Sequence, residues 1–415
     1  MKVSVTQGKG PKSVTVSDKD SESQRYMQMA LRLARRGISS VEPNPAVGAI
    51  IVKANQIIGR GYHKKFGGPH AEINALQDCQ SLGVKPGGAT MYVTLEPCCH
   101  QGKTPPCTQA LISAGIAKVF VAMIDPSGHA NGKGITQLRE AGIEVHAGIC
   151  ETEAKLLNAP FVKYATTGKC WVTVKWAQTI DGKLAWAEKS DEQRWISSKL
   201  SRRDAHKLRR RNQAVLVGIN TVLADDPLLT ARPSLDKKAV RIVLDSFLRI
   251  PPGCRLLETA KDGPVIIFTS RRAIETKPQA AQEIAGKGAE LLTYPDTNGG
   301  SNLHCLLDEL GRRGISQLLV EGGPTVLTSF LKENLADEIV VYIAPTILGA
   351  QGAAEITGPM AQLAESVGLR HVDVGRLGDD VRLSGFTDKA FREIGIGPAK
   401  AEPPVTSIVA EPVDE

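Results

Sequence analysis

The sequence predicts an α/β protein with two domains. Its 415 residues exceed what one ordinary core accommodates. Segments with helical spacing alternate with short apolar runs that are typical of buried strands. We expect domains at residues 21–167 and 168–392. The flanking residues 1–20 and 393–415 are predicted to be disordered, because they are polar or proline-rich and could not bury enough apolar surface to offset the entropy of ordering.

The first half predicts a layered α/β domain. Apolar residues at helical spacing predict a helix over 23–36, and two strands at 46–52 and 56–61 are joined by a short turn. A long helix over 151–166 is expected to close the domain. The other expected elements are helices at 70–80, 105–114 and 134–141 and strands at 90–95, 118–123 and 144–147.

One histidine, two cysteines and a spare carboxylate stand out in this half. The tripeptide H-A-E at 70–72 opens a predicted helix, E-P-C at 96–98 follows a predicted strand, and Cys107 lies in the first turn of the next helix. Three nitrogen or sulfur ligands with an open fourth position are typical of catalytic zinc, which activates water near neutral pH. Helix N-termini favour thiolates. We therefore predict one Zn²⁺ per chain held by His70, Cys98 and Cys107, with Glu72 as the proton carrier.

The spacing of the two cysteines separates this site from related zinc sites. Zinc deaminases that act on nucleobases carry H-x-E followed by P-C-x-x-C, whereas Cys107 lies nine residues after Cys98 here. The longer loop contains His100, Lys103 and Thr104, which could bind a substrate phosphate or carbonyl.

Two further residues are expected at the rim of the zinc site. Asn44, between two prolines, could bind an amide edge of a heterocycle, and His63 ends the second strand. Each also has an ordinary interpretation, because an Asn-Pro turn is common loop chemistry and a single histidine is often only structural.

The second half predicts a mostly parallel sheet. The expected strands are 170–176, 214–217, 240–244, 265–268, 317–320 and 338–343, and the expected helices are 197–211, 303–313 and 324–331. The segment V-E-G-G-P at 320–324 joins a strand to a helix, where glycines let a ligand approach and the helix N-terminus can hold a phosphate. It is not G-x-G-x-x-G, and a plain tight turn is the alternative.

Together these motifs resemble the bifunctional riboflavin-biosynthesis deaminase/reductase family. The matching segments are P-N-P-A-V-G at 43–48, G-Y-H at 61–63, H-A-E at 70–72 and T-L-E-P-C-C-H-Q-G-K-T-P-P-C at 94–107, and the resemblance continues to about residue 390. It implies a three-layer α/β/α domain similar to cytidine deaminases, followed by an α/β domain similar to dihydrofolate reductase.

The resemblance also implies two reactions. The first is zinc-dependent removal of the 2-amino group of 2,5-diamino-6-(5-phosphoribosylamino)pyrimidin-4-one, and the second is reduction of the ribosyl unit by NADPH. Lys175 and Glu321 are the candidate proton donors for the reduction. The implied cofactor residues are Ala177, Trp195, Thr221, Asp225, Gly322, Gly323, Pro324 and Thr325. The implied substrate residues of the reductase are Lys175, Arg209, Leu229, Arg232 and Glu321.

Two of these assignments have weaknesses at the level of single residues. Arginine pairs bidentately with phosphate, but Arg209 alone also fits a solvated face of a basic helix. Gln193 stands where the family often has serine, so no catalytic role is carried over to it. A degenerate reductase domain is therefore one alternative.

Composition bears on the other classes of function. An aromatic content of 4% and the cysteine spacing disfavour a nucleic-acid-editing deaminase, and Glu72 disfavours a purely structural zinc site. The net charge of +7 fits a slightly basic solvated surface. We expect a phosphorylated pyrimidine as the substrate, no nucleic-acid or membrane partner, and, from the family, a dimer or tetramer formed through reductase domains. Eight cysteines without a secretory signal favour the cytoplasm.

Overall fold

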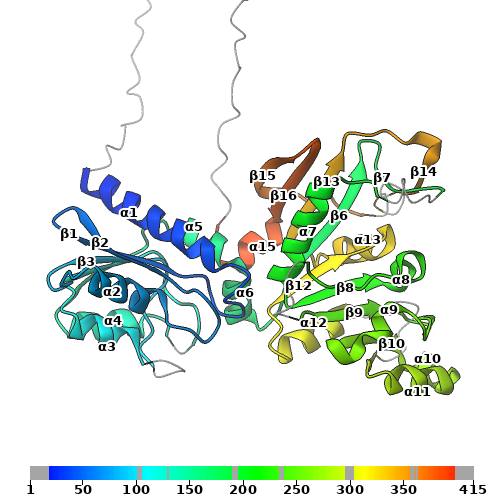
Figure 1. Ribbon diagram of the computed structural model, residues 1–415, viewed down its shortest axis with the longest axis horizontal. Helices are drawn as coiled ribbons and strands as arrows, with labels where there is room; N and C mark the ends of the chain where they lie inside the picture. The colour runs from blue at the N-terminus through cyan, green and yellow to red at the C-terminus, as the bar shows by residue number, and fades with distance from the viewer. Residues whose placement is uncertain are drawn as a thin grey trace, which may run out of the picture. The chain divides into compact units, whose positions relative to one another are not determined.

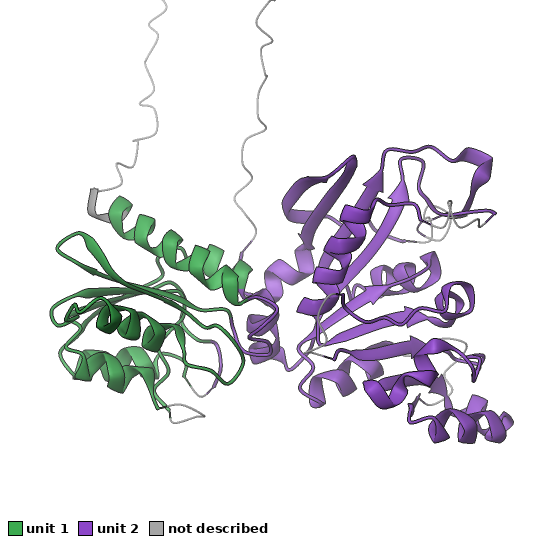
Figure 2. Cartoon of the chain, in the orientation of Figure 1, with its two compact units in different colours: residues 1–37, 46–125, 129–157 green, residues 38–45, 126–128, 158–415 purple. Residues whose placement is uncertain are grey.

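The computed structural model describes residues 18–100, 105–128, 130–188, 195–232, 238–294, 303–355, 360 and 363–397. Within them the chain forms two compact units (Figure 2). The first unit lies within residues 1–37, 46–125 and 129–157, and the second within 38–45, 126–128 and 158–415. None of the described helices is both long and apolar enough to cross a bilayer.

Unit 1 is a five-stranded sheet with strand order β2-β1-β3-β4-β5. Strand β1 runs antiparallel to β2 and β3, whereas β3, β4 and β5 are parallel. Its elements are α1 (Asp18–Ala34), η1 (Arg35–Gly37), β1 (Gly48–Lys53), β2 (Gln56–Tyr62), α2 (Ala71–Ser81), β3 (Thr90–Val93), α3 (Cys107–Ser113), β4 (Lys118–Val121), α4 (Lys133–Glu140), β5 (Glu144–Ala147) and α5 (Glu151–Leu157).

Helices cover both faces of this sheet, as predicted. Helices α1 and α5 lie on one face and α2, α3 and α4 on the other (Figure 1). Two glycines let the helices approach the strands closely. A Cβ at Gly48 would lie 2.0 Å from the carbonyl oxygen of Ala30 in α1, and one at Gly61 would lie 2.2 Å from that of Ala71 in α2. The direct contact between α2 and β2 fixes where α2 begins, and therefore where its first residues point.

The single helix predicted over 151–166 is wrong. Helix α5 ends at Leu157, Asn158 has non-helical dihedral angles (φ −109°, ψ 23°), and α6 (Ala159–Thr167) begins with a proline in its first turn. Pro160 lacks the N–H that a continuous helix would use, and its ring would clash with the preceding turn. Helix α6 groups with unit 2.

Unit 2 is built on a nine-stranded sheet with strand order β11-β10-β9-β8-β12-β6-β13-β16-β15. The strands from β11 to β13 are parallel, as predicted, and β16 and β15 continue the sheet antiparallel. Strands β7 and β14 form a separate pair. Besides α6, its elements are β6 (Trp171–Thr179), β7 (Lys183–Trp186), α7 (Lys199–Arg211), β8 (Ala214–Gly218), α8 (Ile219–Asp225), β9 (Val240–Leu244), α9 (Arg255–Glu258), η2 (Ala260–Asp262), β10 (Val265–Ser270), α10 (Arg271–Thr276), α11 (Pro278–Gly286), β11 (Glu290–Tyr294), α12 (Leu303–Arg312), β12 (Gln317–Glu321), α13 (Pro324–Lys332), β13 (Glu338–Ala344), η3 (Gly349–Gln351), β14 (Gly352–Glu355), β15 (Leu369–Leu377), β16 (Asp380–Thr387) and α15 (Asp388–Glu393).

The two faces of this sheet carry separate apolar cores. Val172 and Val174 of β6 face the core formed with α12 and α13. The opposite face packs against α7, α8, α9 and α11. Because side chains alternate along a strand, Lys175 points to this second face. The arrangement places a lysine of β6 under α7.

A buried ion cluster fastens α6 to unit 2. Lys163 Nζ lies 2.8 and 2.6 Å from the two carboxylate oxygens of Asp337, which is fully buried just before β13. Asp337 also accepts a hydrogen bond of 2.7 Å from the backbone N–H of Val172 and lies 3.2 Å from Lys389 of α15. Glu393 lies 3.1 Å from Lys163. These contacts explain why α6 groups with the second sheet, although the sequence placed it in the first domain.

Candidate active sites

The predicted metal ligands converge in unit 1. His70 caps the N-terminus of α2, Cys98 follows β3, and Cys107 begins α3. His70 Nδ1 lies 3.5 Å from Cys98 Sγ and 3.4 Å from Cys107 Sγ, and the three ligand atoms all lie within 4.8 Å of one another. The backbone N–H of Cys107 donates to Cys98 Sγ over 3.3 Å. The ends of three elements therefore meet at one point.

The chemistry of these donors fits a zinc ion. In the chain alone, a hydrogen bond from the Cys107 thiol lowers the pKa of Cys98 to about 4, with a further contribution from His70. The same contact and burial raise the pKa of Cys107. The two sulfurs thus share a proton that a cation can replace, and an imidazole nitrogen completes a set of three ligands.

Glu72 lies beside the ligands without belonging to their cluster. It is the second residue of α2 and is only 3% exposed. Burial raises the pKa of Glu72 to about 7, and the charge of Cys98 acts in the same direction. A carboxyl group whose pKa is near neutrality can both accept and return a proton, as general acid–base catalysis requires.

Glu96 is a buried carboxylate to which the sequence assigned no role. Its Oε1 accepts hydrogen bonds from the backbone N–H groups of Gly134 (2.8 Å) and Ile135 (3.3 Å). Its Oε2 accepts from Asp125 (3.1 Å) and Gly132 (2.9 Å). Glu96 therefore ties the turn that carries Cys98 to the start of α4. Its place in the E-P-C motif was the available signal, but its partners lie some thirty or more residues away along the chain.

The other predicted deaminase residues differ in what the structure shows of them. The His63 ring is buried and lies 5.4 Å from that of His70, and its Nδ1 is 3.0 Å from the Pro69 carbonyl oxygen. Burial lowers the pKa of His63. His100 is exposed, and the Asn44 backbone N–H donates to Val41 within a segment that groups with unit 2. Lys103 and Thr104 lie outside the described residues.

Three neighbouring strands of unit 2 bring the predicted reductase residues together. In the registers of β12, β6 and β13, Lys175 pairs with Glu321 on one side and Val340 on the other. Helix α7 covers these side chains. From α7, Arg209 makes two hydrogen bonds to the Glu321 carboxylate, from Nε over 3.0 Å and from Nη2 over 2.7 Å.

The proximity of Glu321, Arg209 and Lys175 shifts the pKa values of Glu321 and Lys175. Burial opposes ionisation of Glu321, but the charges of Arg209 and Lys175 outweigh it and lower the pKa of Glu321 to about 2. Burial lowers the pKa of Lys175, which Glu321 partly offsets. A third nitrogen of Arg209 donates to the carbonyl oxygen of Thr230 over 3.3 Å, beside the buried Leu229. Arg209 therefore uses much of its donor capacity within the protein.

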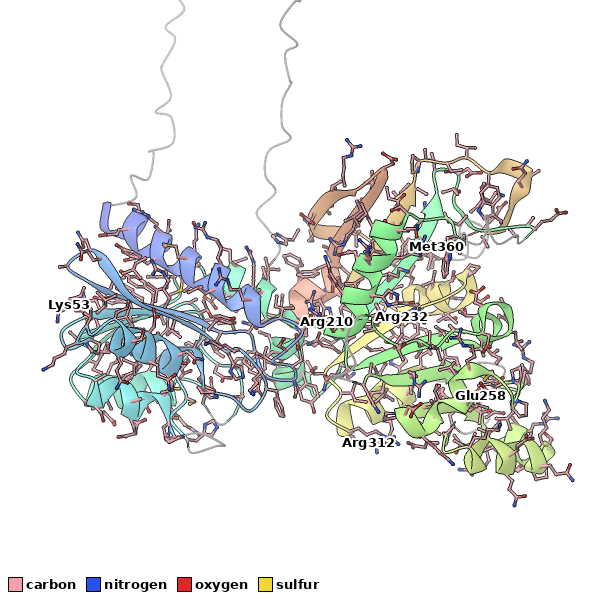
Figure 3. All side chains as sticks on the ribbon, in the orientation of Figure 1. Lys53, Arg210, Arg232, Glu258, Arg312 and Met360 are labelled. Carbon is pink, nitrogen blue, oxygen red and sulfur yellow. The ribbon has the colours of Figure 1, made fainter. Side chains whose placement is uncertain are left out.

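Arg232 and His206 stand close to this ion pair. Arg232 is exposed and labelled in Figure 3. Burial and the charges of Arg209 and Arg232 lower the pKa of His206, which lies one turn before Arg209 on α7. The sequence did not single out His206. Gln193, whose role the sequence left in doubt, lies outside the described residues.

The predicted cofactor residues lie at the carboxyl ends of adjacent parallel strands. Thr221 and Asp225 belong to α8, which follows β8, and Gly322–Thr325 follow β12, the neighbour of β8. Gly322 has φ +140°, and a Cβ there would lie 3.2 Å from Thr221 Oγ1. A Cβ at Gly323, which caps α13, would meet no atom within 4 Å. This open backbone at the start of a helix fits a phosphate of a dinucleotide.

The two remaining predicted cofactor residues also belong to unit 2. Ala177 follows Lys175 on the same face of β6 and packs against the core under α7. Trp195 is 56% exposed, and the Arg202 guanidinium lies 5.0 Å from its ring centroid. An exposed indole can cover a flat ligand.

Unit 1 thus has the fold of a zinc-dependent deaminase and a cluster of one histidine and two cysteines that could hold the metal. Unit 2 has the fold of a dinucleotide-dependent reductase. Residues 20–123 match the family model for the cytidine and deoxycytidylate deaminase zinc-binding region, and residues 170–383 match that for the RibD C-terminal domain. The riboflavin biosynthesis protein RibD of Aquifex aeolicus (strain VF5) is 46% identical over 357 residues, which cover 86% of this chain and 96% of the relative. RibD of Escherichia coli (strain K12) is 38% identical over 376 residues, 87% of this chain and 98% of the relative.

Solved structures of RibD proteins are also similar to this chain. Acinetobacter baumannii RibD, form 2, is 37% identical with a TM-score of 0.74, covering 89% of this chain and 100% of that one. A diaminohydroxyphosphoribosylaminopyrimidine deaminase/5-amino-6-(5-phosphoribosylamino)uracil reductase from Thermotoga maritima is 34% identical with a TM-score of 0.74, covering 89% and 99%. The chain belongs to the RibD family of riboflavin-biosynthesis proteins. The family resemblance and the predicted fold class are confirmed.

Proposed function

We propose that this chain catalyses two consecutive steps of riboflavin synthesis. Unit 1 hydrolyses the 2-amino group of 2,5-diamino-6-(5-phosphoribosylamino)pyrimidin-4(3H)-one to give 5-amino-6-(5-phosphoribosylamino)uracil. Unit 2 then reduces the ribosyl side chain with NADPH to give 5-amino-6-(5-phosphoribitylamino)uracil. The observation that carries the proposal is the convergence of His70, Cys98 and Cys107 within 4.8 Å beside the buried Glu72, on a chain that also carries the reductase fold.

For the deamination, His70, Cys98 and Cys107 would hold Zn²⁺ and Glu72 would move the proton. A bound zinc ion supplies Lewis-acid activation of water near neutral pH. Glu72 would take one proton from the attacking water and deliver it to the ring nitrogen. It would then carry the second proton of that water to the departing amine, which leaves as ammonia. His63, beside His70, and the loop residues His100, Lys103 and Thr104 would bind the substrate, as would Asn44.

For the reduction, Lys175 and Glu321 would contact the substrate. Lys175 would supply the proton, because Glu321 is ionised and has none to donate. NADPH supplies the hydride when it is bound. Thr221, Asp225 and the glycine loop would hold it, with Ala177 and Trp195 completing its site. The exposed Arg232 would pair with the substrate phosphate. Arg209 would contribute its remaining donors to the substrate while keeping Glu321 ionised, and Leu229 would line the pocket.

We further propose that the protein is a cytoplasmic homo-oligomer associating through reductase domains. None of the eight cysteines, all of which belong to the described residues, forms a disulfide bond, which fits a reducing compartment. Strand β15 ends the nine-stranded sheet with Val372 and Val374 at least half exposed, and an apolar edge strand favours pairing with another chain. Light scattering of Val374→Lys against the wild type tests this edge, because a dimer formed there would dissociate.

Product analysis tests the proposed reactions. Zinc-loaded protein is incubated with the diaminopyrimidinone ribotide, with and without NADPH, and the products are identified by mass spectrometry. We expect the aminouracil ribotide without NADPH and the ribityl product with it. Recovery of the unchanged substrate under both conditions would refute the assignment.

A further inference from the structure

Lys175 has a neighbour on the side opposite to Glu321. Strand β13 lies next to β6, and its register places Tyr342 two residues beyond the partner of Lys175, on the same face. The Lys175 Nζ lies 5.5 Å from the centroid of the Tyr342 ring. This distance is within the range in which an ammonium group is attracted by the face of an aromatic ring. The lysine is therefore held between a carboxylate and a ring.

The Tyr342 ring is itself fixed. It is only 1% exposed, and its hydroxyl donates to Asp204 Oδ2 over 2.9 Å. Asp204 belongs to α7, and its Oδ2 also lies 3.2 Å from Arg382 Nε. Arg382 is the register partner of Tyr342 on β16, so that β13, β16 and α7 all contribute to one anchor. A buried ring anchored through its hydroxyl offers a constant surface to the ammonium group.

Two residues of α7 anchor the groups on either side of Lys175. Arg209 holds the Glu321 carboxylate, and Asp204, from the same helix, holds the Tyr342 hydroxyl. Lys175 lies on β6, between the strands that carry these two anchored groups. Its own electrostatic surroundings comprise Glu321 from β12, Arg209 from α7 and the Tyr342 ring from β13.

We propose that Tyr342 is a positioning residue of the reductase, whose buried ring holds the Lys175 ammonium group in place for the reaction. The proposal rests on the proposed role of Lys175 at the substrate. Tyr342 does not contact the reacting atoms; it acts through the lysine. It would limit the rotamers of a long, flexible side chain and stabilise its charged form.

Two substitutions separate the ring from the hydroxyl. Tyr342→Leu removes the ring, whereas Tyr342→Phe keeps the ring and removes only the hydroxyl. We expect Tyr342→Leu to lower the reductase kcat roughly 5- to 30-fold, the range of a partly desolvated cation–π contact, with little change in KM. Tyr342→Phe should stay within about threefold of the wild type. Tryptophan fluorescence reports whether unit 2 of each variant remains folded, because the tryptophans at 171, 176, 186 and 195 all lie in that unit.

The pH profile of the reductase distinguishes positioning from a packing defect. The ring favours the charged lysine, so its loss lowers the pKa of Lys175 and moves the alkaline limb of kcat to lower pH. The limb should move in Tyr342→Leu and stay in place in Tyr342→Phe. An unmoved limb in Tyr342→Leu, or equal losses in both variants, would overturn the proposal. Lys175→Met provides the separate check: full reductase activity in that variant would refute the role of the lysine itself, and with it that of Tyr342.

Discussion

Replacing Lys163 by methionine should destabilise unit 2 without affecting the chemistry of unit 1. Lys163 is 3% exposed and contacts both oxygens of the fully buried Asp337, at 2.8 and 2.6 Å. Removing one partner of a buried ion pair leaves an uncompensated charge and costs about 3–5 kcal/mol. Because Lys389 remains 3.2 Å from Asp337, we expect the lower end, about 3 kcal/mol. For a unit of this size that loss corresponds to a fall in Tm of roughly 6–12 °C.

The assay can be confined to unit 2 because all four tryptophans of the chain, at positions 171, 176, 186 and 195, lie in that unit. Tryptophan fluorescence during thermal and urea unfolding therefore reports on unit 2 alone. Arg312→Met is the matched control, since its side chain is 73% exposed and its ion pair with Glu309 should be worth less than about 1 kcal/mol.

A second variant tests the reason for the loss. In Lys163→Met/Asp337→Asn the buried charge is removed, while an amide oxygen can still accept from the Val172 N–H. This double variant should be more stable than Lys163→Met by about 1 kcal/mol or more. The account of this cluster is wrong if Lys163→Met has the same Tm as Arg312→Met. It is also wrong if the double variant is no more stable than Lys163→Met.

Three further predictions concern the two sites. Glu72→Gln should retain one zinc per chain by metal analysis but lose ammonia release by at least about 100-fold; substantial residual turnover would exclude Glu72 as the proton carrier. Cys107→Ser should lower the zinc content well below one per chain, whereas Cys305→Ser, in the exposed part of α12, should leave it unchanged; equal zinc in both would break the ligand assignment. Because the folded-state pKa of Glu321 is lowered from 4.5 to about 2, its contribution to stability is fully present above about pH 4.5 and is lost as the pH falls toward 2. The difference in unfolding free energy between wild type and Glu321→Gln, up to about 3 kcal/mol, should therefore shrink between pH 5 and pH 3 in urea titrations; a constant difference would contradict the assigned pKa.

The sequence predicted the features that depend on residues close together along the chain. His70, Cys98 and Cys107 each stand at the end of an element, so their spacing and the order of strands and helices suffice to bring them together. The parallel part of the second sheet follows from its continuous apolar strands. Strand β15 went unpredicted because it is mostly exposed and lacks such a run. Pro160 marked the break between α5 and α6, but a proline early in a helical pattern also fits a helix start.

Contacts between residues far apart in the sequence could not be predicted from the sequence pattern. Glu96 binds backbone groups of a distant loop, and no local feature names them. Tyr342 lies within an apolar strand and reads as an ordinary core residue; only the strand register places it against Lys175. The Arg209–Glu321 pair likewise joins residues that lie 112 positions apart. These contacts depend on the order in which strands enter the sheet, which a single sequence does not state.

The central claim is that deamination at the zinc site feeds reduction at the second site of the same chain. The most direct measurement follows ammonia release and NADPH consumption together in the purified protein supplied with the diaminopyrimidinone ribotide. We predict that both signals appear, that ammonia release precedes NADPH consumption, and that removing zinc with a chelator stops both. NADPH consumption that persists in chelated protein without ammonia release, or zinc-loaded protein that gives neither signal, would contradict the account.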